Sequence, residues 1–387
     1  MNMLLQVLSY FAFFVVALNY LDSIEKIKRI IRITVVCGFV VSMYGIIRKL
    51  SIPADTWNIP HLKNLAFSTF TNRNHFAAYI EMIIPLAIAL AFIERTKFLR
   101  LAFITAASVM SFALFLSFSR AGVVCFLISF IVMLVILNTK INIKKITTVL
   151  LALILIFVVL FLSVHTQEVL KRLGSLTNPL AAYGWRAVFI KDSLNIAKDF
   201  PILGVGFGTY GNIYQKYSTL KTSGGLFISN NFAHNEPLQL LVEAGLIGFL
   251  LILIFLFFVF RGSFKMWRER NNIFVVYLWP ACCMSLIVAS LHSFFDFTMH
   301  IPANAILFFL VLAIFYRVIR LPRHDEIADS YSRIEIKLTI FSRVIAIGLL
   351  SVSLLFIENL IVNRYRAKKI VDNLAKEVVS LNQDKQA

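Results

Sequence analysis

The sequence predicts an all-α fold, a polytopic bundle of transmembrane helices, and three observations lead to this prediction. Of the 387 residues, 59% are hydrophobic and only 15% are charged, whereas soluble domains are about 45–50% apolar and about 25% charged. The mean hydropathy is +0.81. Apolar runs of about 20 residues, the length that crosses a bilayer, recur along the chain. A multi-pass membrane protein is therefore expected.

Ten candidate spans follow one another. They cover residues 3–21, 31–50, 75–93, 100–118, 121–138, 146–165, 238–260, 274–297, 302–319 and 340–362. The first has neither a basic start nor a small-residue cleavage site, so a signal peptide is not expected there. The predicted organisation is six transmembrane helices in 1–165, a large loop in 166–236, four more helices in 237–363 and a charged tail in 364–387.

The distribution of basic residues predicts the orientation. In a soluble protein the net charge of +18 would suggest a nucleic-acid partner, but here the positive-inside rule explains most of it and no nucleic-acid partner is expected. Alternate connections are basic, and they contain Lys26 to Arg32, Arg95 to Arg100, Lys140 to Lys145, Arg261 to Arg270 and Arg317 to Arg343. With these in the cytoplasm, the loop 166–236 and both termini lie outside.

The large outer loop is expected to carry helical structure of its own. Its segment 184–199, GWRAVFIKDSLNIAKD, has the apolar spacing of a short amphipathic helix on the outer surface. The glycine-rich run after it, FPILGVGFGTYG (200–211), formally matches a dinucleotide fingerprint. No βαβ unit surrounds that run, so we interpret it as a flexible loop over a site.

The stretch 230–248, NNFAHNEPLQLLVEAGLIG, begins polar and continues as a long apolar helix. Pro237 suits a first helical turn, because that position needs no amide hydrogen. Asn235 or Glu236 would be the N-cap. His234 is therefore expected at the mouth of a membrane helix, at the boundary between water and lipid.

Ionisable residues inside the predicted spans gather near their outer ends, and intramembrane charge is costly enough to indicate function. This group consists of Glu81, Arg120, Glu243, His292, Asp296 and Glu358, with His75 and His300 at the helix ends themselves. Interfacial snorkelling explains one or two such residues. It does not explain so many carboxylates and histidines on one side.

Five motifs follow one another in this chain. They are TNRNHFAAYIEMIIPLAIAL (71–90), SFSRAG (117–122), GWRAVFIKDSLNIAKDFPILGVGFGTYG (184–211), AHNEPLQLLVEAGLIGFLL (233–251) and HSFFDFTMHIPANAILFF (292–309). In this order they resemble the motifs of the bacterial O-antigen ligase and O-antigen polymerase superfamily. The resemblance covers roughly 70–310. Family members usually have about twelve helices and often a soluble repeat domain after the last, whereas this sequence predicts ten and a short tail.

The resemblance implies a membrane glycosyltransferase. Such enzymes transfer a glycan from a polyprenyl (undecaprenyl) diphosphate carrier to a sugar hydroxyl of a glycan or glycolipid acceptor, without metal or cofactor. A departing diphosphate needs planar, bidentate positive donors, which arginine supplies. Arg120 and Arg186 match the two arginine positions of the family, and Arg73 is a third candidate for diphosphate binding.

His234 matches the family histidine and is the candidate general base. An imidazole with an unperturbed pKa of about 6.5 suits the removal of a hydroxyl proton, and direct attack would invert the anomeric centre. Asn235 and Glu236 are expected to orient this ring. The other supporting candidates, which we expect to tie helix ends together by hydrogen bonds, are Asn72, His75, Glu81, Asp296 and His300.

Several alternatives stay open at this stage. A ligase acting on a lipid A-core or similar acceptor and a repeat-unit polymerase for O-antigen or exopolysaccharide would use the same donor and base. A transporter for such lipids would carry charges near the midplane of two related halves, which the sequence does not suggest. A non-catalytic scaffold among envelope polysaccharide assembly proteins is the third class. The expected location is the bacterial inner membrane, with the site facing the periplasm.

Overall fold

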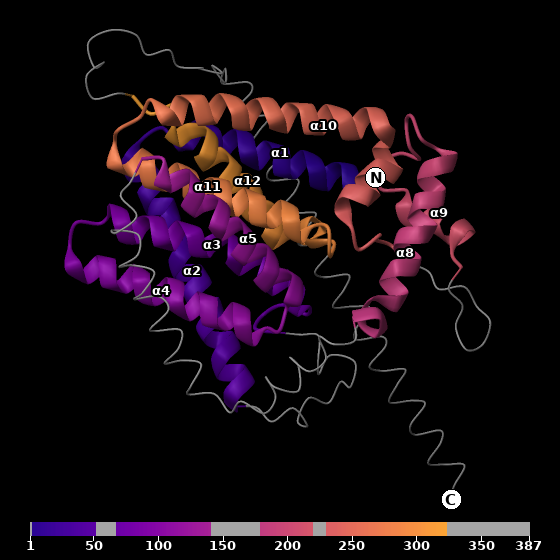
Figure 1. Cartoon of the computed structure of the whole chain (residues 1–387), viewed down its shortest axis with the longest axis horizontal. Coiled ribbons are helices and arrows are strands. Elements are labelled where there is room, and N and C mark those ends of the chain that lie inside the picture. Colours follow the sequence, from indigo (N-terminus) through magenta and orange to yellow (C-terminus); the bar gives the residue numbers. More distant parts are fainter. Residues whose placement is uncertain (1, 52–66, 141–178, 220–229, 323–387) are drawn as a thin grey trace, which may run out of the picture.

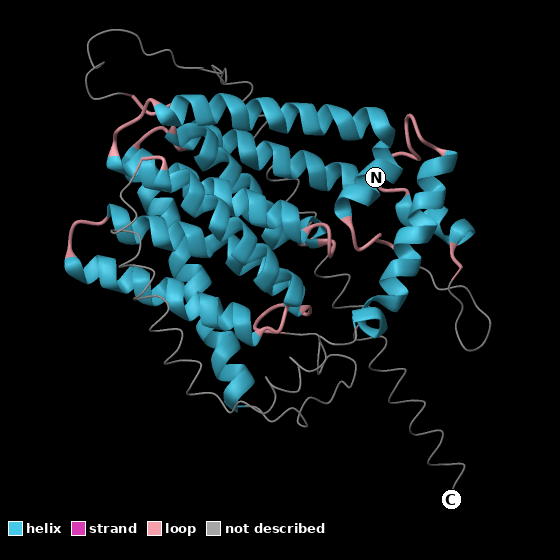
Figure 2. Ribbon diagram, viewed as in Figure 1, coloured by secondary structure: helices cyan, strands magenta, loops and turns pink. Residues whose placement is uncertain are grey.

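The computed structural model describes residues 2–51, 67–140, 179–219 and 230–322. Figure 2 shows helices joined by short loops in these ranges. No strand occurs in the part of the chain described, and the only extended pairing there is an isolated bridge between Phe67 and Phe70. The predicted all-α class is confirmed.

Eight of the described helices correspond to predicted spans. They are α1 (Asn2–Tyr20), α2 (Ile24–Ser51), α3 (Arg73–Ile93), α4 (Lys97–Leu116), α5 (Arg120–Asn138), α10 (Glu236–Arg268), α11 (Ile273–His292) and α12 (Pro302–Val318). Six of the eight are long and apolar enough to cross a membrane, while α1 and α12 contain shorter apolar segments. The predicted spans 146–165 and 340–362, and the tail 364–387, lie outside the described residues. The chain is a multi-pass membrane protein.

Helices α3 and α11 form the centre of the bundle. Helix α11 lies against α3, α5 and α12, while α4 packs on α3, α2 on α4 and α1 on α12. Helix α10 runs along one edge (Figure 1). Its far end is anchored by aromatic packing, because Trp267 stacks on Trp279 at 5.3 Å between ring centroids. The centre of the fold is thus buried on all sides, whereas α10 keeps a long exposed face.

Three predicted span boundaries were wrong. Helix α2 begins at Ile24 rather than at residue 31, and α10 continues to Arg268 rather than ending at 260. Helix α11 ends at His292 instead of 297. In the turn that follows, Asp296 Oδ1 accepts the amide hydrogen of Phe297 at 3.0 Å, and such side-chain bonds compete with helix formation. A short 3-10 turn η4 (Thr298–His300) then leads to α12.

The backbone of helix α10 is interrupted near its start, and the glycine-rich loop forms hydrogen bonds with both sides of the interruption. Gly245 has φ 65° and ψ −175°. The loop accepts hydrogen bonds from the second half of the helix, with Leu246 N donating to Pro201 O at 2.8 Å, and donates to the first half, with Gly206 N bonding Glu243 O at 2.9 Å. The run expected to be a flexible loop therefore supplies the backbone partners that the broken helix lacks.

Two glycines make this interlock possible. A Cβ on Gly245 would lie 2.2 Å from Ile202 O, and one on Gly204 would lie 2.5 Å from Glu243 O. Both residues also adopt positive φ, where a side chain is strained. The close approach of the two backbones therefore requires glycine on both sides.

The outer segment forms a small layer of its own, made of α8 (Pro179–Asp199) and α9 (Tyr210–Tyr217). Figure 1 shows both at one end of the bundle, beside the start of α10. Phe189 and Ile196 of α8 pack with Tyr210 and Tyr214 of α9 in a shared apolar cluster. Leu194, one of the apolar residues in the segment predicted as an amphipathic helix, is 44% exposed. Helix α8 thus buries its apolar face on protein.

The basic connections meet at the opposite end of the bundle. Arg32 forms an ion pair with Glu94 at 2.6 Å, which joins the start of α2 to the α3–α4 connection. Arg317 Nε donates to Leu21 O at 3.0 Å, and Arg270 Nε donates to Ile319 O at 3.1 Å. The described parts of the basic connections thus lie at the end opposite the Asp296 turn, as the charge distribution predicted.

Candidate active site

Asp296 is the centre of the polar group at the α8–α9 end. Its side chain is buried, and it belongs to the turn between α11 and α12. Oδ1 lies 3.0 Å from His234 Nδ1, while Oδ2 accepts a hydrogen bond from Asn74 Nδ2 at 2.7 Å. Arg186 Nη2 approaches Oδ2 at 3.5 Å. One carboxylate thus connects α3, α8 and the loop before α10.

Burial alone would raise the pKa of Asp296, but its partners outweigh that effect. The hydrogen bond from His234, the Arg186 guanidinium and the Asn74 amide together hold the pKa of this carboxyl well below its usual range. The carboxylate is therefore ionised at neutral pH. It places a fixed negative charge beside the imidazole.

His234 sits between aromatic rings directly before α10. Its ring meets Phe297 edge-on at 4.8 Å between centroids and lies nearly parallel to Phe189 at 5.9 Å. The backbone adopts φ 52°, a left-handed conformation that is uncommon for a residue other than glycine. Such strain often marks functional positions, and here it aims Nδ1 at Asp296.

Arg186 projects from α8 toward the same turn. Its Nη1 donates to Phe295 O at 2.9 Å, in addition to the contact with Asp296, and the side chain is 19% exposed. The guanidinium therefore lies beside the histidine–aspartate pair, where a planar group of donors can meet an anionic substrate.

The start of α5, where Arg120 lies, is connected to Asp296 through two short polar side chains. Ser119 caps the start of α5 and donates from Oγ to Asn74 Oδ1 at 2.9 Å, and Asn74 in turn donates to Asp296. Arg120 follows Ser119 as the first residue of α5 and is half-buried. Sequence reasoning missed Asn74 and Ser119, although both stand next to predicted arginines and both occur where a helix begins.

Arg73 begins α3 and is half-buried, one residue before Asn74. Asn72 is the N-cap of that helix, and its side chain accepts the Asn74 amide hydrogen at 2.9 Å. The structure thus brings the starts of α3, α5 and α10 to one level of the bundle. Helix N-termini favour anions, so their fields add to those of the arginines.

Asn235 and Glu236 hold the start of α10. Asn235 is the N-cap and accepts the Leu238 amide hydrogen at 3.0 Å. Glu236 Oε1 lies 3.3 Å from His300 Nδ1 and also accepts from the Met299 amide. In the described contacts Asn235 caps α10 itself and Glu236 ties α10 to the turn before α12, while the His234 ring contacts Asp296.

His75 and Glu81 lie deeper in the bundle. Glu81 hydrogen-bonds to His292, the last residue of α11, and both side chains are fully buried. The His75 ring contacts Phe297 edge-on at 4.9 Å, and its carbonyl accepts from Asn304 Nδ2 at 3.1 Å. These contacts join α3 to α11 and α12 below the Asp296 turn.

The chemistry this arrangement offers is proton transfer next to anion binding. A histidine oriented by a buried carboxylate can accept a proton on its other nitrogen. Arg186 contacts the same carboxylate, and hydrogen bonds join the starts of α3 and α5 to it. Within the described ranges, no group of three or more histidine, cysteine or carboxylate side chains is positioned to hold a metal ion.

Comparison with known proteins identifies one family. Residues 101–253 match the family described as O-antigen ligase. The matched stretch runs from α4 into α10 and includes Arg120, Arg186 and His234; Arg73 and Asp296 lie outside it. No curated protein matches the chain. The resemblance to the O-antigen ligase superfamily is thereby confirmed over these residues, and it supports a glycosyltransferase activity of the ligase or polymerase type.

Proposed function

We propose that this multi-pass membrane protein, similar to O-antigen ligases, transfers a glycan from an undecaprenyl-diphosphate carrier to a sugar hydroxyl of a glycan or glycolipid acceptor. In this proposal the site faces the periplasm of a bacterial inner membrane. The observation that carries it is the contact of His234 and Arg186 with the same buried carboxylate, Asp296. A base and an anion-binding group thereby share one fixed support.

His234 is the proposed general base. With the Nδ1 proton donated to Asp296, Nε2 keeps a lone pair and accepts the proton of the acceptor hydroxyl. The hydroxyl oxygen forms the new bond to the anomeric carbon as the bond from that carbon to the diphosphate oxygen breaks. The electron pair of the broken bond leaves with the diphosphate, and the anomeric configuration inverts.

The proposed partners of the departing diphosphate are Arg120, Arg186 and Arg73. Negative charge grows on the diphosphate oxygens as the bond breaks, so fixed guanidinium groups stabilise the transition state more than the bound donor. The helix starts at Arg73 and Arg120 add positive potential at the same level. The donor's long apolar tail would remain in the bilayer.

The test is the surface-polysaccharide gel profile of a deletion strain complemented with His234→Ala or Arg186→Ala. Loss of high-molecular-weight glycan in both, together with accumulation of carrier-linked donor, is the expected result. The matched control is Arg95→Ala, an exposed arginine at the opposite end of the bundle, which should leave the profile unchanged. Membrane levels of all variants must be equal. Normal glycan from both site variants would overturn the catalytic proposal in favour of a scaffold.

The accumulated donor also separates the two enzymes within the proposal. A ligase deprived of its base leaves long glycan chains on the carrier, because polymerisation precedes its step. A polymerase leaves single repeat units. The length of the carrier-linked glycan, measured after mild acid release, therefore identifies the acceptor class.

A further inference from the structure

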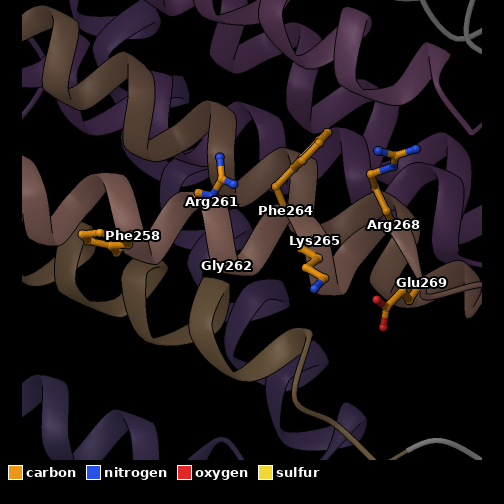
Figure 3. A pocket seen from close by; sticks show the side chains of 7 residues that line it. All are labelled: Phe258, Arg261, Gly262, Phe264, Lys265, Arg268 and Glu269. Atoms are coloured by element: carbon orange, nitrogen blue, oxygen red, sulfur yellow. The ribbon is translucent and has the colours of Figure 1, made fainter.

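A pocket of about 690 Å³ lies on α10 at the end opposite the candidate active site (Figure 3). It is lined by Phe258, Arg261, Gly262, Phe264, Lys265, Arg268 and Glu269. Three of these side chains are cationic and one is anionic. In Figure 3, Arg261 and Arg268 extend to one side of the helix axis and Lys265 to the other. The cations thus flank a strip of the helix surface.

The same strip continues along α10 as an apolar surface. Leu251, Ile254 and Phe258 are exposed by 62%, 51% and 64%. They precede Arg261 and Lys265 at intervals of three or four residues, the spacing that places helical side chains on one face. One face of α10 is therefore apolar over two turns and cationic over the next two.

Gly262 leaves the cationic part of this face hollow. A Cβ at this position would meet nothing within 4 Å among the residues that the structure describes. Arg261 and Lys265 next to it are exposed. A group of atoms can therefore approach the helix backbone between charged side chains, which a larger residue at 262 would prevent.

We propose that this face of α10 binds one anionic phospholipid, independently of the glycosyl transfer proposed above. The lipid phosphodiester lies over Gly262 between Arg261 and Lys265, with Arg268 beyond it, and an acyl chain follows Phe258, Ile254 and Leu251. Along α10 an apolar stretch is followed by a cationic stretch, and this order complements a phospholipid, whose acyl chains are apolar and whose headgroup is anionic. The excess of cations over the single carboxylate Glu269 favours an anionic headgroup over a zwitterionic one, as in basic pockets between membrane helices.

The test is native mass spectrometry of the full-length chain in detergent, titrated with palmitoyl-oleoyl phosphatidylglycerol or with the zwitterionic phosphatidylcholine of the same chains. The wild type should bind phosphatidylglycerol about tenfold more tightly or better, since each basic side chain near a headgroup contributes about fivefold. Arg261→Gln/Lys265→Gln/Arg268→Gln should abolish this preference. Gly262→Leu, which fills the hollow without a change of charge, should weaken it by a similar factor.

Matched controls separate this site from the general basic charge of the same end. Arg29→Gln/Arg95→Gln/Lys97→Gln removes three exposed cations from neighbouring connections and should preserve the preference. Equal melting temperatures establish that the variants are folded. If wild type shows no preference for phosphatidylglycerol, or if both α10 variants retain it, the proposal is overturned and another segment or a second copy covers the face.

Discussion

Replacement of Asp296 by asparagine tests how the candidate site holds its base. The substitution keeps the shape of the side chain but removes its charge and turns one oxygen into a donor. Whichever way the new amide lies, its NH₂ faces groups that now donate to Asp296. On one side these are His234 Nδ1 and the Phe297 amide, both at 3.0 Å, and on the other Asn74 Nδ2 at 2.7 Å. No orientation of the amide satisfies both sides.

The expected loss of rate follows from these contacts. A hydrogen bond to a charged group contributes about 1.5–3 kcal/mol, and about 1.36 kcal/mol corresponds to tenfold in rate. Its loss therefore costs about 10- to 150-fold. If the amide turns its NH₂ toward His234, the ring proton moves to Nε2 and the base is lost, which costs up to about 10⁴-fold in a serine-protease triad. We expect Asp296→Asn to slow glycan transfer about 10- to 10⁴-fold.

The assay is the initial rate at which membranes of the complemented deletion strain consume carrier-linked glycan. Asp199→Asn is the matched control, because Asp199 is an exposed carboxylate of α8 and should keep the wild-type rate. If Asp296 acts through His234, adding Asp296→Asn to His234→Ala should cause little further loss, because residues of one network are not additive. Near-wild-type turnover by Asp296→Asn, or full additivity in the double variant, would refute the positioning role.

Three further outcomes are expected. The folded-state pKa of Asp296 lies below the unfolded value of about 3.9. Its ionisation therefore stabilises the fold fully above about pH 4, and this contribution is lost as the pH falls further. The melting temperature of Asp296→Asn should decline less steeply than that of wild type below pH 4. Gly245→Ala should abolish folded protein in membranes, since positive φ costs roughly 1–2 kcal/mol and the new Cβ would also lie 2.2 Å from a carbonyl oxygen. Gly262→Ala on the same helix has open space around it and should leave stability, measured by thermal unfolding in detergent, equal or higher. Arg186→Lys should slow transfer at least about tenfold despite its retained charge, because lysine cannot contact Phe295 O and an anion with one planar group; a rate within about threefold of wild type would show that charge alone suffices.

Much of the fold could be predicted because a bilayer requires long apolar helices. The N-cap at Asn235 and the proline after it also gave a correct start for α10. The predicted end of α11 was wrong, since Asp296 lies in the turn after the helix, where it bonds His234 and Asn74. An apolar run in the sequence does not reveal such contacts. The break at Gly245 was missed for a similar reason. Its stability depends on the backbone of residues 201–206, which only the folded chain brings close.

The candidate site could be predicted as a set of residues but not as a network. Sequence placed His234, Arg186 and Asp296 at one level, yet it offered the adjacent Asn235 and Glu236 as partners for the histidine. The structure pairs the His234 ring with Asp296, which is 62 residues away in sequence. That contact requires the α11–α12 turn to fold back on the start of α10, where Glu236 N bonds Ser293 O at 2.9 Å. The local sequence does not predict that these two segments lie together.

This geometry gives different structural roles to Asp296 and to the residues next to His234. A general base, the role proposed for His234, must keep one nitrogen toward its orienting carboxylate and the other toward the substrate. His234 Nδ1 meets Asp296 from a left-handed backbone at φ 52°. Hydrogen bonds of the residues on either side stabilise that backbone conformation. Ala233 N donates to Gln239 Oε1 at 3.1 Å, and Asn235 caps α10. Residues adjacent to His234 in sequence thus hold its backbone, while the distant Asp296 holds its ring, and the proposed proton transfer requires both so that Nε2 meets the acceptor hydroxyl at a defined point near Arg186.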